Sequence, residues 1–301
     1  MFIKKILNKL VNILGYKIVK NKPGNHGNPS KSYQVKVGNY YITMPGNNPL
    51  VKHYEYFPNY NIELGKLAQI ISKKYPDSYL IDIGANVGDT IAVVKSVVNI
   101  PIIAIEGDQF SYKFLSQNAL LFDEVHTINQ FLGEKSEKKM IKAEKEGWNT
   151  TLIPTTNGSN WITLKTLDES LKENKLSSVN TKLIKIDAEG FDTIILRGAL
   201  DTILKFSPVL YFEYNRENMD IIGEDGLATL FSLSESGYDN IAFLDNHNRC
   251  LMYTSLAQKD IIQQLHNYAD GIHGLIPHYD ICIFHKTDSD IAREFLNLNN
   301  I

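Results

Sequence analysis

The chain has 301 residues, a formal net charge of −3 and 43% hydrophobic residues, which is ordinary for a folded protein with one large core or two smaller ones. All 34 acidic residues lie beyond residue 54, whereas the first 54 residues carry nine lysines. An acidic body lacks the positive surface that a nucleic acid requires, so we expect no nucleic-acid partner. The two distant cysteines exclude a disulfide framework, and no apolar run is long enough to span a membrane.

Residues 2–19 are predicted to form a basic amphipathic helix, because Ile and Leu recur there at helical spacing with lysines between them. Such a helix can lie on an anionic membrane surface, or it can pack against the body of the protein or a second copy of the chain. Residues 21–32 are rich in Gly, Pro, Asn and Ser, which is typical of a linker. Since no signal peptide is evident, we expect a cytoplasmic protein, held at the inner face of the membrane if the helix binds lipid.

Residues 33–75 are predicted to be an extension that precedes the main domain. Tyr33–Met44 alternates like a pair of strands, and Ile62–Lys74 has the pattern of a helix. Between them, the segment 47–60 gathers five rings: His53, Tyr54, Tyr56, Phe57 and Tyr60. Aromatic rings with polar tips suit a lid over a sugar or an adenine, and equally a small satellite apolar cluster.

From residue 79 the pattern alternates between strand and helix, which predicts an α/β fold with a doubly wound parallel sheet over 76–287. Strands are expected at 79–83, 102–106, 125–130, 182–187, 208–213, 239–244 and 279–284, and helices at 89–98, 110–121, 191–204 and 225–236. Two irregular segments interrupt this alternation, one at 134–166 with extra hairpin strands and one at 255–277. Residues 288–301 are expected to form a C-terminal helix.

The most informative segment is Tyr79–Thr90, in which a buried strand is followed by a glycine turn and then a helix. Gly84 and Gly88 let the backbone come close to a ligand, and the helix that follows directs free N–H groups toward it. A turn of this kind after the first strand is where doubly wound sheets hold a nucleotide or nucleoside. The sequence therefore predicts a nucleoside-binding site at this edge of the sheet.

The spacing of the turn favours S-adenosylmethionine over NAD as the cofactor. Asn86 stands where a dinucleotide fingerprint has its middle glycine, so a pyrophosphate would be held less well. Glu106 ends the next strand, where its carboxylate can accept both hydroxyls of a ribose. The other residues predicted to bind the cofactor are Asp82, Ala85, Asp89, Gly107, Asn129 (or Gln130 beside it) and Asp187.

A second motif, Leu183–Asp192, supplies candidates for the chemistry, because another buried strand ends here in a turn rich in carboxylates. The proposed general bases are Asp187, Glu189 and Glu213, together with His273 in the loop before the last strand. Asp187 and Glu213 also offer the oxygen ligands that Mg²⁺ prefers. Two interpretations stay open: a magnesium site, or carboxylates that act without a metal.

Taken together, the motifs resemble the FkbM-type family of S-adenosylmethionine-dependent methyltransferases. The matching pieces, in family order, are Asp82–Gly88, Glu106, Thr166–Asp168, Lys185–Asp192 and Arg197–Ala199. The resemblance implies a seven-stranded sheet whose last strand is antiparallel. It also implies O-methylation, frequently of a sugar hydroxyl in cell-surface polysaccharide or glycan biosynthesis, or of a natural product.

Two alternatives remain at this stage. One is an NAD-dependent sugar-modifying oxidoreductase, which would need a pyrophosphate cradle at the glycine turn. The other is a protein that binds S-adenosylmethionine without catalysing transfer, although acids retained at several strand ends argue against that loss. A sugar or glycan acceptor, peripheral membrane contact and self-association are the partners that the sequence suggests.

Overall fold

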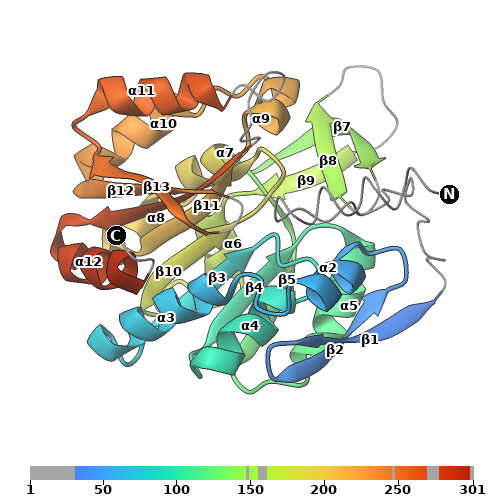
Figure 1. The fold of residues 1–301 in the computed structure, drawn as a ribbon. Helices are drawn as coiled ribbons and strands as arrows, with labels where there is room; N and C mark the ends of the chain where they lie inside the picture. Colours follow the sequence, from blue (N-terminus) through green and yellow to red (C-terminus); the bar gives the residue numbers. More distant parts are fainter. Residues whose placement is uncertain (1–30, 147–148, 155–160, 246–247, 270–277, 299–301) are drawn as a thin grey trace, which may run out of the picture.

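A single large sheet organises the molecule (Figure 1). The computed structural model describes residues 31–146, 149–154, 161–245, 248–269 and 278–298. The eight strands run in the order β13-β12-β14-β11-β10-β3-β4-β5. Their bounds are β3 (Tyr79–Ile83), β4 (Ile102–Glu106), β5 (Val125–Asn129), β10 (Thr181–Ile186), β11 (Val209–Tyr214), β12 (Tyr238–Leu244), β13 (Cys250–Ser255) and β14 (Tyr279–His285).

The strands β5, β4, β3, β10 and β11 are parallel neighbours, so their carboxyl ends meet along one edge. The last strand, β14, lies between β11 and β12 and is antiparallel to both. This confirms the predicted α/β class, the seven expected strands and the antiparallel last strand. The structure adds β13 as an eighth strand, paired antiparallel with β12. Its residues are exposed or half-buried, as expected for a strand at the edge of the sheet.

Helices cover both faces of the sheet, because successive residues of each buried strand point to opposite sides (Figure 1). One face carries α3 (Ile62–Lys74), α4 (Asp89–Val97), α5 (Gln109–Ala119) and α12 (Ser289–Leu298). The other carries α6 (Leu167–Glu173), α7 (Asp192–Arg197), α8 (Leu200–Phe206), α10 (Leu227–Ser232) and α11 (Lys259–Tyr268). Shorter elements are α2 (Leu50–Tyr56), α9 (Arg216–Ile222), η1 (Leu233–Ser236) and η2 (Lys286–Asp288).

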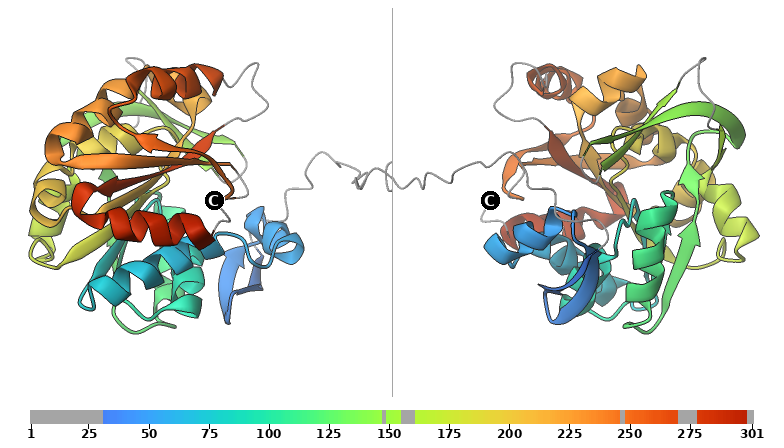
Figure 2. Two further views of the ribbon diagram at one scale, coloured as in Figure 1. Left: turned by 60° about the vertical axis from the view of Figure 1, so that its left-hand side comes forward. Right: turned by 90° about the vertical axis from the view of Figure 1, so that its right-hand side faces the viewer.

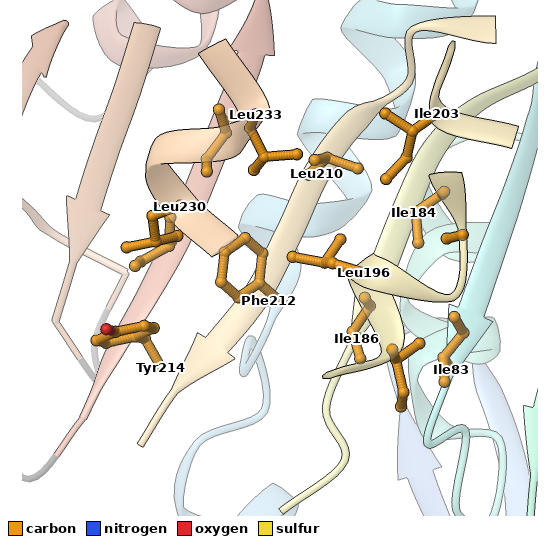
Figure 3. Close-up of a cluster of buried hydrophobic side chains, with 14 of the residues drawn as sticks. Ile83, Ile184, Ile186, Leu196, Ile203, Leu210, Phe212, Tyr214, Leu230 and Leu233 are labelled. Carbon is orange, nitrogen blue, oxygen red and sulfur yellow. The ribbon is translucent and has the colours of Figure 1, made fainter. Parts of the chain in front are cut away.

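Figure 3 shows the core on the face that carries α7 and α10, where buried side chains of β10 and β11 meet the helices. Ile184, Ile186 and Phe212 point from the strands toward Leu196 and Leu230 on the helices. All five side chains are almost completely buried. Each such side chain contributes about 1.5–3 kcal/mol when it leaves water, so this core fixes where the strand ends lie.

The N-terminal part packs against the main domain beside the glycine turn (Figure 2). It consists of the hairpin β1 (Ser32–Val37) and β2 (Tyr40–Pro45), as predicted, followed by α2. The side chain of Asn118 on α5 joins the two parts. Its Oδ1 accepts from the Thr43 N–H at 2.8 Å, and its Nδ2 donates to the carbonyls of Thr43 and Val87, both at 2.8 Å. The extension is thereby held next to the turn that begins α4.

A four-stranded sheet interrupts the alternation after β5, where the sequence predicted extra hairpin strands. Its strands are β6 (Phe131–Leu132), β7 (Glu137–Glu146), β8 (Asn149–Pro154) and β9 (Trp161–Lys165), in the order β6-β9-β7-β8. The pair β7–β8 is antiparallel, as expected for a hairpin.

Three predictions require correction or fall outside the described residues. The single helix expected over 191–204 is two helices, because α7 ends at Gly198, its C-cap residue, and glycine is a poor helix former. The segment 255–277 is not wholly irregular, since it contains α11. The predicted helix over residues 2–19 lies outside the described residues. Within the described ranges, no helix has the length and apolar character needed to cross a bilayer.

Candidate functional site

A cleft opens at the carboxyl ends of β3, β4 and β10, the edge where doubly wound sheets bind ligands. Its walls are the turn after β3, the end of β4 and the turn after β10, and the N-terminal part closes it with Leu50 and Tyr60. About 1040 Å³ within it, open mouth included, is free of atoms. Most of the predicted site residues therefore come together here.

The glycine turn is shaped by a close backbone approach. Gly84 has φ 72°, and a Cβ there would lie 1.8 Å from the carbonyl oxygen of Asp187. The N–H groups of Gly84 and Ala85 both donate to the Ile105 carbonyl, at 2.9 and 3.1 Å. Gly88, with φ 85°, then begins α4. No residue with a side chain fits at Gly84. The turn therefore brings the ends of β3, β4 and β10 together at the floor of the cleft.

Glu106 is held in the cleft by main-chain N–H groups. Its Oε2 accepts from the Asn86 N–H at 2.9 Å and its Oε1 accepts from the Asp108 N–H at 2.7 Å. Burial raises the pKa of this carboxyl to about 7, although both hydrogen bonds favour the charged form. Each oxygen keeps a further lone pair, so the carboxylate can accept two hydroxyls, as predicted.

Asp82, predicted to bind the cofactor, does not line the cleft and lies behind it. Its side chain is 0% exposed, and its Oδ1 lies 3.0 Å from Nζ of Lys185. Lys185 lines the cleft and lies 3.8 Å from Oδ2 of Asp187. Burial raises the pKa of Asp82, whereas for Lys185 the neighbouring carboxylates outweigh burial and raise its pKa. The positive charge of Lys185 offsets the cost of placing the carboxylates of Asp82 and Asp187 close together.

Asp89 lines the cleft at the first turn of α4 and accepts a hydrogen bond from the Tyr54 hydroxyl at 2.8 Å. Burial raises the pKa of Asp89 to about 6. Tyr54 is therefore not a lid residue: it is buried and braces an acid of the turn. The hydrogen bond between Tyr54 and Asp89 thus connects α2 to the first turn of α4.

Asn129 does not line the cleft, which corrects its assignment as a ligand-binding residue. Its Nδ2 donates to the carbonyls of Glu106 and Gly107 at 2.8 and 3.2 Å, so the side chain supports the end of β4. Gln130 lines the cleft instead. Gly107 lines it too, and a Cβ there would lie 2.1 Å from the ring of Phe131.

The turn after β10 presents the acids predicted for chemistry. The Asp187 side chain is 51% exposed and lines the cleft together with Glu189. Glu189 has φ 51° and accepts from Nδ2 of Asn218 at 2.8 Å. Asp192 accepts from the N–H groups of Ala188 and Gly190, at 3.4 and 3.2 Å, and so closes the turn. Burial raises the pKa of Glu189 to about 7 and that of Asp192 to about 8.

Glu213 ends β11 next to this turn, and the structure pairs it with a residue that the sequence analysis missed. Nε2 of His278 lies 3.5 Å from Oε1 of Glu213. Burial raises the pKa of Glu213 well above its usual range, and Asp187 is its strongest charged neighbour. Burial also lowers the pKa of His278 and favours the neutral imidazole. The signal was available, because His278 precedes an antiparallel last strand that must begin beside the end of β11. The predicted candidate, His273, lies outside the described residues.

Nothing in the described residues supports the predicted magnesium site at Asp187 and Glu213. Among those residues, no group of three or more His, Cys, Asp or Glu side chains is placed to hold a metal ion. Lys185 already stands beside Asp187, where it supplies positive charge to the acids.

The remaining motif pieces have structural roles outside the cleft. Asp168 accepts from the N–H groups of Asp201 and Thr202, at 2.9 and 3.0 Å, and so caps α8. Thr166 caps α6 by accepting from the Glu169 N–H. Arg197 pairs with Glu224 at 2.9 Å. Two further Arg197 partners are Glu134 and Thr229.

Comparison with known proteins confirms the resemblance. The family model described as the methyltransferase FkbM domain matches residues 82–239, a stretch that contains the glycine turn, Glu106 and the Asp187 turn. None of the curated proteins compared with the chain matches it significantly. A methyltransferase family, rather than the NAD-dependent oxidoreductase considered above, therefore accounts for the cleft.

Solved structures of methyltransferases are similar at low identity. A methyltransferase FkbM from Methylobacillus flagellatus KT shares 18% identity, with a TM-score of 0.41, over 59% of this chain and 44% of its own. Precorrin-6y C5,15-methyltransferase from Geobacter metallireducens GS-15 shares 15%, with a TM-score of 0.38, over 73% and 86%. The N-terminal domain of human METTL16, in complex with SAH, shares 12%, with a TM-score of 0.39, over 81% and 75%. The chain thus spans less than half the length of the FkbM structure.

Proposed function

Because the chain belongs to the FkbM family of S-adenosylmethionine-dependent methyltransferases, we propose that it methylates a sugar hydroxyl during the synthesis of a cell-surface polysaccharide or glycan. The observation that carries this proposal is the union of two features in one cleft. A nucleoside-type turn and Glu106 form one wall, and the acids Asp187 and Glu189 form the other.

The residues of the first wall fit the cofactor. Glu106 offers acceptors to ribose hydroxyls, and the N-terminus of α4 lines the same space with Asp89 and Thr90. When bound, S-adenosylmethionine supplies a methyl group on a positively charged sulfur. Asp89 and Gln130 are the further polar side chains of this part of the cleft. These residues would bind and orient the cofactor, and aligning the reactants can supply about 7–11 kcal/mol of the barrier.

The residues of the second wall suit a hydroxyl acceptor. A sugar hydroxyl becomes a good nucleophile only when a base within hydrogen-bond reach takes its proton. Asp187 is exposed to the cleft and serves as the proposed base. Glu189 is the second candidate, because its raised pKa of about 7 lets it hold the proton at neutral pH. Nζ of Lys185 lies 3.8 Å from Oδ2 of Asp187 and balances the charge of this acid.

The neighbouring Glu213–His278 pair offers a route for the proton out of the cleft. Neutral His278 can accept a proton, and the negative charge of Asp187 would stabilise the imidazolium that results. The same acids disfavour a nucleic-acid acceptor, whose phosphates they would repel. They favour a polyhydroxylated acceptor, because carboxylates accept hydrogen bonds from hydroxyl groups.

The test is methyl transfer to defined glycans, followed by mass spectrometry. Cell-surface glycans from strains with and without the gene are compared for a difference of about 14 daltons, one methylene group. Purified protein with S-adenosylmethionine should restore the mass to glycans from the strain that lacks the gene. A mass gain confined to protein or lipid would contradict the sugar acceptor while leaving the methyltransferase assignment intact.

A further inference from the structure

A second hollow lies beside the cleft, on the surface of α2 and the turn after it. We call it the aromatic shelf; it is lined by Pro49, Leu50, His53, Tyr56, Phe57 and Tyr60. The Tyr56 side chain is 67% exposed and that of Phe57 is 52% exposed. Two large rings side by side in solvent are costly for a folded protein, and such surfaces commonly mark binding sites.

The shelf is continuous with the cleft. Leu50 and Tyr60 line both hollows, so they form the boundary between them. Tyr60 is also close to the acids of the reaction side. Burial raises the pKa of its hydroxyl, and the charge of Asp187 is the next largest cause. A molecule that places one of its groups beside Asp187 can therefore continue past Tyr60 onto the shelf.

The rings of the shelf form an ordered surface. The His53 ring meets Tyr60 edge to face, with ring centroids 4.2 Å apart, and lies 5.1 Å from the ring of Phe57. Within the described part of the chain, Nε2 of His53 is buried and has no hydrogen-bond partner. Lys52 adds a polar, exposed rim. The shelf thus offers flat apolar rings with a charged side chain at the rim.

We infer that the aromatic shelf binds the sugar units adjacent to the one that is methylated, so that the acceptor is an oligosaccharide or polysaccharide chain. This inference rests on the proposed function. The C–H face of a pyranose is apolar and packs on aromatic rings, while its hydroxyls need polar partners at the rim. The shelf and the cleft share Leu50 and Tyr60, so a sugar chain with one unit beside Asp187 can extend onto the shelf. This continuity favours a sugar chain over a bilayer as the occupant.

The experiment measures kinetics by release of S-adenosylhomocysteine, with sugars of two lengths. The probes are methyl glycosides of mannose, rhamnose, galactose and N-acetylglucosamine and the matching trisaccharides. The variants are Tyr56→Ala, Phe57→Ala and the double variant. The control is Tyr41→Ala on β2, which removes an equally exposed ring (62%) from the same N-terminal part but outside both hollows.

In the shelf variants, KM for the accepted trisaccharide should rise about tenfold with kcat nearly unchanged, because a stacking contact worth about 1.4 kcal/mol is lost. KM for the methyl glycoside and the Kd of S-adenosylhomocysteine should stay at wild-type values. Saturation-transfer NMR on wild-type protein with S-adenosylhomocysteine should show signals from the outer sugar units, and the double variant should lose them. Tyr41→Ala should behave like wild type in every measurement.

Three results would overturn the inference, each in a recognisable way. An unchanged KM for the trisaccharide would show that the shelf does not touch the acceptor. Weaker sedimentation of Tyr56→Ala with phosphatidylglycerol vesicles, at unchanged KM, would assign the shelf to a membrane. If no sugar is methylated although S-adenosylhomocysteine binds normally, the proposed function fails, and the inference falls with it.

Discussion

The two walls of the cleft are built in different ways. The cofactor wall is a backbone structure: Gly84 and Ala85 donate to one carbonyl, and Glu106 is held by two N–H groups. The reaction wall is formed by the side chains of Asp187 and Glu189, and the pair of Glu213 and His278 lies next to it.

This difference shows how each wall is encoded. A backbone turn needs particular residues at adjacent positions, so a short stretch of sequence specifies it. The reaction wall and the pair next to it draw on β10, β11 and the start of β14, which meet only after the sheet has formed. Burial raises the pKa of carboxyls on both walls, of Glu106 and Asp89 on the cofactor wall and of Glu189 on the reaction wall. The two walls therefore differ in how they are encoded, and both hold acids that are costly to ionise.

The largest expected effect is that of Gly84→Ala. A Cβ would lie 1.8 Å from a backbone oxygen, so the floor of the cleft must shift; we expect a loss of several kcal/mol in the free energy of unfolding and no detectable binding of S-adenosylhomocysteine. The matched control is Gly223→Ala, which has φ 73° and nothing within 4 Å of the added Cβ. That change should cost only about 1 kcal/mol in urea unfolding. Equal losses for both would contradict the close-approach account.

On the reaction wall, Asp187→Asn should reduce turnover by about 10²–10⁴-fold, because an amide cannot take a proton from the acceptor. Methyl transfer to an accepted glycan measures this loss. Asp201→Asn removes an exposed carboxyl from α8 and should leave turnover unchanged. Wild-type turnover in Asp187→Asn would remove Asp187 as the base and leave Glu189 as the candidate.

The buried acids also predict how stability depends on pH. The folded-state pKa values of Glu189, Asp192 and Asp280 are raised by burial to about 7, 8 and 7, whereas the unfolded chain titrates near 4. The folded state then binds more protons between pH 4 and 8, so stability falls as pH rises through this window. We expect a loss on the order of 1 kcal/mol per pH unit for each such acid. Urea unfolding of the ligand-free protein at pH 6 and pH 8 tests the sign; greater stability at pH 8 would contradict it.

A smaller effect concerns the cofactor wall alone. With a pKa of about 7, Glu106 is mostly protonated at pH 6 and mostly ionised at pH 8. Since the ionised carboxylate is the better acceptor for ribose hydroxyls, S-adenosylhomocysteine should bind about tenfold more tightly at pH 8. Calorimetric titrations at the two pH values measure this difference. In Glu106→Gln the affinity should be weaker and independent of pH; a retained pH dependence would point to another group.

The fold was largely predictable, because its signals are local. Buried strands such as β3 and β4 are short apolar runs, and the helix α3 falls at its predicted bounds, Ile62–Lys74. The helix break at Gly198 was missed although its signal is also local, because glycine disfavours a helix interior. The edge strand β13 was missed since its residues are largely exposed or half-buried.

The site was predictable only in part, because only some of its residues are marked by a local pattern. The positions of Gly84, in a turn, and of Glu106, at a strand end, were enough to identify both as site residues. Asn129 shares the strand-end position with Glu106, but its side chain turns back to the main chain. The pairing of His278 with Glu213 follows from the antiparallel placement of β14 beside β11, a signal that lies in the topology and not in the residues around either side chain. Long-range topology is therefore what limits prediction of the reaction wall.

The most direct test of the central claim, that one cleft has a cofactor wall and a separate reaction wall, is calorimetric titration of S-adenosylhomocysteine into two variants. Glu106→Ala should weaken binding at least about tenfold, because the acceptors for the ribose are lost. Asp187→Asn should bind within about threefold of wild type, because the change lies on the other wall. Unchanged affinity in Glu106→Ala, with binding lost in Asp187→Asn, would contradict this division of the cleft.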